Sequence, residues 1–190
     1  MATELRDTEV VTGKVQLQFV HLAEPKGIGD GPKKYQAMVV FDANDRATLK
    51  SIQKAIEAAK QKGIAEVWGG KEPRKLKLPL RDGEEEFPDD ENFEGKMFLN
   101  AYSARQPILV DRKVKPIRTT DIEDELYSGV YARVNLNFYP YAPQNGGGSW
   151  IAVGLEMVQK VADGERLGGG GPKDPGAVFD PVDDEDADLI

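Results

Sequence analysis

Cysteine is absent from the 190-residue chain, and the only histidine is His21. Without cysteine the protein has no disulfides, no thiolate metal ligands and no cysteine nucleophile. A single histidine excludes a metal site built on two imidazoles and leaves one candidate imidazole base. His21 ends an apolar stretch with no recognisable nucleophile or orienting acid beside it, so we expect it to be structural.

Long apolar runs are also absent. None approaches the roughly 18–20 residues that a membrane-spanning helix needs. The first residues, Met1 to Glu4, lack the basic-then-apolar pattern of a signal peptide. We therefore expect neither membrane insertion nor secretion. Aromatic residues make up only 8% of the chain, which is typical of one domain with a modest core and attached loops and tails.

The net charge of −8 argues at first against a nucleic-acid partner. The acids are unevenly distributed, however. Residues 167–190 contain seven acids and one lysine, and the segment Asp82–Glu94 contains eight acids and no base. The remaining residues contain 18 acids and 24 bases, a net charge of +6. The overall sign therefore says little about the ligand, because most of the chain is mildly basic.

The chain divides at the glycine run that begins at Gly168. Few apolar residues follow it, so we expect a folded domain over residues 1–166 and a glycine-rich linker with a disordered acidic tail over 167–190. The candidate partner-binding segment of this tail comprises Asp183, Asp184, Glu185, Asp186, Asp188, Leu189 and Ile190. The other acidic segment, Asp82–Glu94, contains Pro88 and is expected to form an exposed loop.

Alternating hydrophobicity predicts mostly β-structure. The expected strands cover residues 14–19, 35–41, 96–102, 107–110, 130–141 and 150–161. Glycine-rich residues 27–33 predict a hairpin loop, and residues 145–149 predict the turn between the last two strands. Within the last strand, Ile151, Val153, Leu155 and Met157 should share one face.

One segment has helical periodicity instead, carried by Leu49, Ile52, Ile56 and Ala59. It predicts a helix over residues 45–62, with Asp42 or Asn44 as the N-cap and Gly63 as the C-terminal stop. About six strands with one inserted helix predict a mainly β protein. A small, partly closed antiparallel barrel fits this content, and the OB-fold is one common case.

The strand over 130–141 has the most informative polar face. Tyr131, Arg133 and Tyr139 lie on that face, where residues two apart are about 7 Å from each other. Aromatic rings with an interleaved guanidinium can form a platform on which bases stack irrespective of sequence. The alternative is that these tyrosines pack under neighbouring loops with their hydroxyls in water.

Further candidates for nucleic-acid contact come from basic and aromatic residues along the chain. Candidate stacking residues besides those above are Trp150, Tyr102, Tyr141 and Trp68. Candidate phosphate contacts are Lys71, Arg74, Lys75, Lys77, Arg105, Arg112 and Lys113. Basic loops beside a sheet suit a phosphate track, because each neutralised phosphate releases condensed counterions. Such residues are also the ordinary solvated surface of a domain.

The enzyme signals are weak. Asp89, Asp90, Glu91 and Glu94 superficially resemble the metal-binding acids of nucleases, but they are too close in sequence to lie on opposing strands around one magnesium ion. Residues 27–33 are glycine-rich but lack the spacing of a phosphate loop or a dinucleotide site. We expect no enzymatic activity and no cofactor. A metal-dependent nuclease or phosphodiesterase remains the alternative function, and a protein–protein adaptor is a third.

A series of motifs in order along the chain carries a family resemblance. They are WGGK at 68–71, PLRDG at 79–83, PDDE at 88–91, VDR at 110–112, YSGVYAR at 127–133, NFY at 137–139 and GLEMVQKVADGE at 154–165. The chain resembles, over roughly residues 10–168, a phage and prophage family formerly catalogued as a domain of unknown function. That family is now grouped with phage single-stranded DNA-binding proteins, among them the acidic-tailed protein of short-tailed coliphages.

The resemblance implies an OB-fold core that binds single-stranded DNA without strong sequence preference, in replication, recombination or repair. It also implies an acidic tail that contacts phage or host replication or recombination proteins, and action inside the bacterial host cell. By composition, this tail is either a solubilising disordered end or a peptide that competes with nucleic acid for the basic groove. In the coliphage relative the tail ends in an aromatic residue and mediates dimerisation; here it ends in Leu189-Ile190. A homodimer is an expectation on the same ground.

Overall fold

The protein is described by a computed structural model that covers residues 4–27, 29–143 and 148–168. The predicted tail segment Asp183–Ile190 lies outside these residues. The described part is mainly β, as predicted, and its strands form one sheet. The strands are β1 (Glu9–Val11), β2 (Val15–Lys26), β3 (Lys34–Asp42), β4 (Leu76–Lys77), β5 (Arg81–Asp82), β6 (Lys96–Ser103), β7 (Ile108–Val110), β8 (Tyr131–Tyr141) and β9 (Ser149–Ala162).

The helical content exceeds the single helix expected from the sequence. Besides the long α1 (Arg46–Glu66), the described residues form α2 (Gly83–Glu86), α3 (Ile122–Glu125) and the 3-10 turns η1 (Glu91–Phe93) and η2 (Thr119–Asp121). These short elements escaped the sequence analysis because they have only three or four residues and no periodicity to detect. None of the described helices combines the length and apolar character that crossing a membrane requires.

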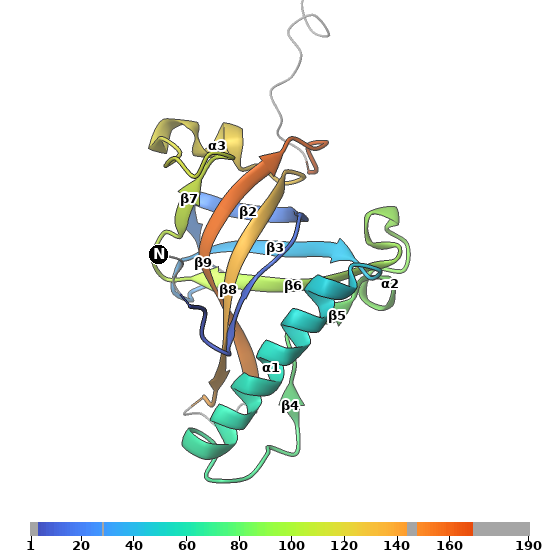
Figure 1. The fold of residues 1–190 in the computed structure, drawn as a ribbon, viewed down its shortest axis with the longest axis vertical. Helices are drawn as coiled ribbons and strands as arrows, with labels where there is room; N and C mark the ends of the chain where they lie inside the picture. The colour runs from blue at the N-terminus through green and yellow to red at the C-terminus, as the bar shows by residue number, and fades with distance from the viewer. Residues whose placement is uncertain (1–3, 28, 144–147, 169–190) are drawn as a thin grey trace, which may run out of the picture.

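The sheet closes partly on itself in the order β2-β3-β6-β9-β8 and back to β2. Two joints of this ring are weak: β6 meets β9 in a single parallel bridge, Tyr102 to Gly154, and β8 meets β2 at two residue pairs. β8 and β9 are the two long strands, and Figure 1 shows them running most of the length of the molecule across β2, β3 and β6. The sheet is thus partly ring-like without forming a clear barrel.

The core lies inside this ring, and β8 supplies one continuous face of it. Val130 and every second residue from it to Phe138 are buried, as the alternation predicts. Alternation also predicts that Met157 lies on the buried face of β9, and this prediction is wrong. The pairing shifts between Asn135 with Met157 and Leu136 with Leu155, so one extra residue bulges out of β9 and reverses the faces. Met157 is consequently exposed while Val158 is buried.

Helix α1 packs one face on the core and begins within one residue of the predicted start, but the predicted N-cap, Asp42 or Asn44, and the predicted stop at Gly63 are wrong. Asp45 is the N-cap, because its carboxylate accepts a hydrogen bond from the Thr48 amide at 3.1 Å. Gly63 lies inside the helix and is buried. A methyl group at Gly63 would lie 2.5 Å from the ring of Trp68. This glycine therefore makes room for an indole that folds back on the helix, and the helix continues past it.

The segment Asp82–Glu94 is not a simple loop. It contains α2 and η1, and it is anchored by a cluster of three phenylalanine rings. Phe87 and Phe93 have ring centroids 4.4 Å apart, and Phe93 meets Phe98 of β6 at 5.6 Å. Asp82 caps α2 through the amides of Glu84 and Glu85. The periodicity analysis missed this lobe because its apolar anchors are isolated among eight acids.

Candidate nucleic-acid interface

A groove of about 570 Å³ crosses the sheet where β3, β6, β8 and β9 meet the short strands β4 and β5. It lies at the end of the molecule where β8 finishes and β9 begins, beside β4 in Figure 1. The aromatic residues in its lining are Tyr102, Tyr139, Tyr141 and Trp150. We call this surface the aromatic groove.

Strand register places these rings next to one another. Tyr141 and Trp150 are directly paired across β8 and β9, and their ring centroids are 4.5 Å apart with planes tilted by 35°. Tyr139 is two residues back on the same face, and it is 41% exposed. Burial, with a smaller contribution from Tyr141, raises the pKa of the Tyr139 hydroxyl. Rings this exposed on a strand face are available to stack on a planar ligand.

The charged residues that line the aromatic groove all carry the same sign. They are Lys26, Lys34, Lys77 and Arg81, and none of the described lining residues is acidic. Arg81 also forms an ion pair with Glu86 at 3.6 Å, outside the lining. The amides of Gln36 and Asn100 add hydrogen-bonding groups. Four cations around exposed aromatic rings suit a polyanion that carries planar bases.

The structure brings together five of the residues singled out from the sequence: Tyr102, Tyr139, Tyr141, Trp150 and Lys77. The lining also contains Lys26, Gln36 and Asn100, which the sequence did not single out. The signal that would have found them is cross-strand register. Tyr102 of β6 pairs with Gln36 of β3, and periodicity within one strand cannot reveal that pairing.

Tyr131 and Arg133 lie at the other end of β8. Tyr139 is eight positions after Tyr131, which is roughly 26 Å along a strand. The Tyr131 ring is half-buried with the Lys14 ammonium 5.1 Å from its centroid. The Arg133 Nε donates a hydrogen bond to the Thr12 carbonyl at 3.1 Å. A DNA contact by either residue stays a prediction, at a place outside the aromatic groove.

The remaining candidates are distributed over other surfaces. Arg112 and Lys113 line a separate groove beside the end of β9. Lys71, Arg74 and Lys75 are exposed in the connection between α1 and β4, and Arg105 is exposed after β6. Trp68 packs partly buried against the core, with its Nε1 buried and without a hydrogen-bond partner. That position gives Trp68 a packing role on α1.

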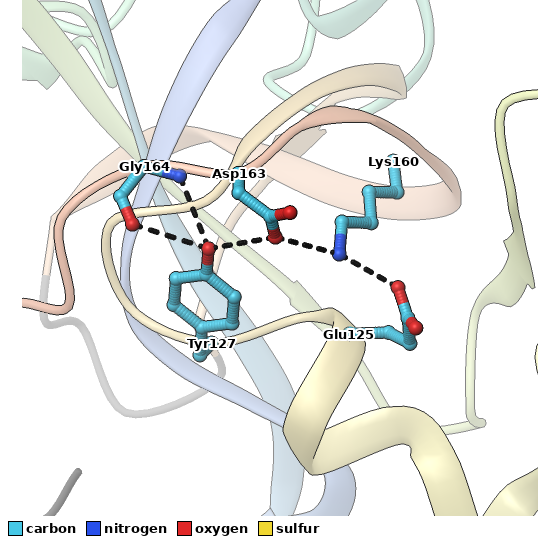
Figure 2. Close-up of polar contacts among 5 residues, drawn as sticks. All are labelled: Glu125, Tyr127, Lys160, Asp163 and Gly164. Carbon is cyan, nitrogen blue, oxygen red and sulfur yellow. Dashed lines mark hydrogen bonds and ion pairs between the residues drawn. The ribbon is translucent and has the colours of Figure 1, made fainter. Parts of the chain in front are cut away.

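A polar network fastens the end of β9 to the turn before β8. In Figure 2 the Tyr127 hydroxyl lies between the Asp163 carboxylate, at 2.9 Å, and the backbone of Gly164. The Lys160 ammonium bridges Asp163 at 2.8 Å and Glu125 at 2.6 Å. Burial opposes the charge on Lys160, yet the two carboxylates raise its pKa. Every polar group is paired here, which identifies a structural clamp.

A larger groove of about 740 Å³ lies along β2 and is a poorer candidate for DNA. Its described lining mixes the acids Glu24, Asp90 and Glu123 with the bases Lys26 and Arg166. Mixed charge gives a phosphate chain little net attraction. Phe19 is also in this lining, 60% exposed at a β2 bulge with φ of +48°.

The acids of the nuclease alternative do not converge. The Asp90 carboxylate accepts hydrogen bonds from the backbone amide and the side chain of Asn92. Asp90 is therefore the N-cap of η1. Among the residues that the structure describes, no three His, Cys, Asp or Glu side chains are close enough to share a metal ion. The geometry of Asp89–Glu94 therefore gives the nuclease alternative no support.

Solved structures of phage single-stranded DNA-binding proteins have a similar fold. The fold is similar to that of the single-stranded DNA-binding protein from bacteriophage Enc34 in complex with ssDNA, with a TM-score of 0.75, 22% identity, and coverage of 88% of this chain and 97% of that one. It is also similar to gp2.5, a single-stranded DNA-binding protein encoded by bacteriophage T7, with a TM-score of 0.58, 18% identity, and coverage of 90% and 94%.

A search of curated protein sequences gave no match. The model of one protein family, described as the Enterobacter phage Enc34 ssDNA-binding protein, matches residues 8–190. This match covers nearly the whole chain, including the residues that carry the aromatic groove. The chain therefore belongs to the Enc34 ssDNA-binding protein family.

Proposed function

We propose that this protein binds single-stranded DNA in the aromatic groove, without strong sequence preference and without bond chemistry. The observation that carries the proposal is the set of aromatic rings, Tyr139 and Tyr141 exposed and Trp150 half-buried, bordered by four cations in a lining whose described residues include no acid. Stacking on aromatic rings is worth about 1–3 kcal/mol per base and tolerates any base, because every base has a π-face.

We further propose that the protein has the role that its family membership implies. The protein coats and protects transient single strands during replication, recombination or repair in the bacterial host cell. Family membership and the DNA-bound structural relative support this role. The ring order β2-β3-β6-β9-β8 supports an OB-fold, a five-stranded and partly open barrel whose sheet face binds oligonucleotides.

We include the acidic tail in the proposal because of its charge alone. Residues 167–190 carry a net charge of −6. The cations of the aromatic groove attract this segment and DNA alike, so the tail competes with DNA. When DNA displaces it, the tail is free to recruit a replication or recombination protein or to pair with a second copy of the chain.

Fluorescence titration tests the proposed function directly. Oligo-dT should quench the emission of Trp150 in the wild-type protein, and duplex DNA of equal length should bind far more weakly. In a Trp68→Phe variant the quench should persist, because Trp68 packs against α1. In a Trp150→Phe variant it should largely disappear. Equal affinity for duplex, or cleavage of the oligonucleotide with magnesium or manganese, would contradict the proposal.

A further inference from the structure

We infer that the larger groove along β2, called the β2 groove below, binds residues 177–179 of the same chain. This contact holds the acidic residues that follow them at the aromatic groove. The inference rests on the proposed single-stranded DNA binding and specifies how the tail is held in competition with DNA. Its anchor is an apolar side chain, Phe179, which lies outside the described residues and would pack against Phe19 of β2.

Phe19 is the first feature that points to an occupant of the β2 groove. It lines the groove from a bulge in β2, 60% exposed and with a φ of +48°. A left-handed backbone is rare for a bulky residue, costs about 1–3 kcal/mol and is concentrated at binding sites. A phenylalanine held in such a conformation outside the core is explained by an apolar partner in the groove.

The same stretch of β2 has an open edge. β2 pairs with β8 only at Val15 and Gln16, and the β2 residues that line the groove all come after these two. Among the residues that the structure describes, β3 is their only strand partner. The Val20 amide donates to the Ser128 Oγ at 3.1 Å, which satisfies one group on this edge. An extended segment can pair with the rest through main-chain hydrogen bonds while its side chains enter the groove.

The chain supplies such a segment next to the β2 groove. Leu167 and Gly168, at the end of the described residues, line this groove, and the Leu167 amide donates to the Ser128 carbonyl at 2.8 Å. Residues 177–179 read Ala-Val-Phe. Phe179 is eleven positions after Gly168, a span of up to about 36–40 Å when extended. The stretch of β2 from Val20 to Lys26 is only about 20 Å long, so the segment reaches all of the groove.

Charge divides the tail into a part that suits the β2 groove and a part that does not. Residues 169–182 contain one base and two acids, whereas residues 183–190 contain five acids and no base. The mixed lining of the β2 groove accepts the nearly neutral first part, while its acids repel the second. Lys26 lines both grooves, so they meet at this residue. A chain anchored by Phe179 therefore delivers its acidic residues to the cations of the aromatic groove.

Substitution of Phe179 distinguishes this anchor from competition by charge alone. Phe179→Ser removes the apolar side chain and leaves every acid of the tail in place. We expect affinity for oligo-dT at low salt to rise about three-fold, because apparent affinity grows with the fraction of molecules whose binding site is open. Phe179→Leu keeps an apolar side chain and should stay close to wild type. Wild-type affinity in Phe179→Ser would overturn the anchor.

Phe19→Ser tests the groove side of the contact, in full-length protein and in protein without residues 172–190. In the full-length protein it should raise affinity as Phe179→Ser does, and the two changes together should add nothing further, since they remove one shared contact. In the truncated protein it should have no effect. A loss of affinity there would show that DNA itself uses Phe19 and would overturn the assigned occupant. Failure of the truncated protein with Phe19 intact to bind oligo-dT would instead contradict the proposed function.

A disulfide trap tests the contact directly, because the chain has no cysteine of its own. Ala23→Cys in the β2 groove, combined with Ala177→Cys, should oxidise within one chain. The oxidised protein should bind oligo-dT about five-fold more weakly than the same protein after reduction, since the bond raises the effective concentration of the tail at the groove. The matched control combines Ala177→Cys with Ala47→Cys, an exposed position on α1, and should oxidise far more slowly. Equal oxidation of the control pair, or disulfide-linked dimers in place of the internal bond, would overturn the inference.

Discussion

Two tyrosines of the same strand have different surroundings and should respond differently to truncation. Tyr139 is exposed in the aromatic groove. Tyr131 is half-buried, and its Cε2 lies 3.0 Å from where a methyl group at Gly164 would be. Their shared face was read correctly from the sequence. Which of them packs could not be read, because packing depends on residues 164–166 returning past β8.

We expect Tyr139→Ala to weaken oligo-dT binding by about 1–3 kcal/mol, the value of one stacked base, with little change in stability. Tyr131→Ala should instead lower the free energy of unfolding by about 2 kcal/mol, because it removes a packed ring. Fluorescence titration and urea unfolding of both variants measure the two effects. A larger binding loss in a folded Tyr131→Ala protein would relocate the stacking platform to the other end of β8.

At the scale of elements, helix α1 shows what periodicity can and cannot predict. The apolar spacing located the helix and its buried face. The glycine rule placed its end at Gly63, but a contact with Trp68 explains that glycine. A glycine selected for packing looks the same in sequence as one selected for a left-handed C-cap, so the helix end was not predictable.

Gly63→Ala should therefore destabilise the protein. Alanine normally gains up to about 1 kcal/mol over glycine in a helix, but here its methyl group would lie 2.5 Å from the indole of Trp68. We expect a net loss of about 1 kcal/mol, since overpacking costs about 1–3 kcal/mol. Urea unfolding measures it. In a Trp68→Ala background the same change should become stabilising, and a loss of equal size there would contradict the contact.

The clamp at the end of β9 should give a pH-dependent contribution to stability. The Lys160 ammonium and then the Tyr127 hydroxyl lower the pKa of Asp163 below its usual 3.8. A lowered carboxyl pKa stabilises the fold above the ordinary value, and this contribution is lost as the pH falls through the folded-state pKa. Asp163→Asn should lower the melting temperature by about 1–3 °C at pH 7.

Calorimetry from pH 7 to pH 2 measures this effect. The difference between Asp163→Asn and wild type should shrink as the pH falls below 3.8 and through the lowered folded-state pKa, where the wild-type carboxylate also loses its charge. The matched control is Asp89→Asn, an exposed carboxylate in the acidic lobe. A difference that stays constant down to pH 2 would show that the hydrogen bonds, and not the charge, hold the clamp.

For the molecule as a whole, the distribution of charge matters more than its sum. The sequence alone shows two acidic segments and a net charge of +6 over the remaining residues. It also indicated β-structure and single-stranded DNA through the aromatic face and the family motifs. The sequence could not show that Lys34 of β3 and Lys77 of β4 line the same groove, because that depends on which strands pair. The clustering of cations in the aromatic groove therefore follows from the order in which the strands pair.

Deleting residues 172–190 should raise affinity for oligo-dT several-fold at low salt, because it removes seven acids and one lysine that compete for the same cations. The gain should vanish at high salt, where screening weakens both interactions. Titrations of full-length and truncated protein at two salt concentrations measure it. Identical affinities at low salt would rule out competition by the tail.

The central claim is that the aromatic groove holds the DNA, and the salt dependence of oligo-dT binding tests it most directly. Each phosphate neutralised on a single strand contributes a slope of about −0.7 to log K against log salt. Lys34→Gln combined with Lys77→Gln should make the slope shallower by about 1.4, whereas Arg112→Gln with Lys113→Gln should leave it unchanged. The reverse pattern, or binding that ignores salt, would contradict the assignment of the groove.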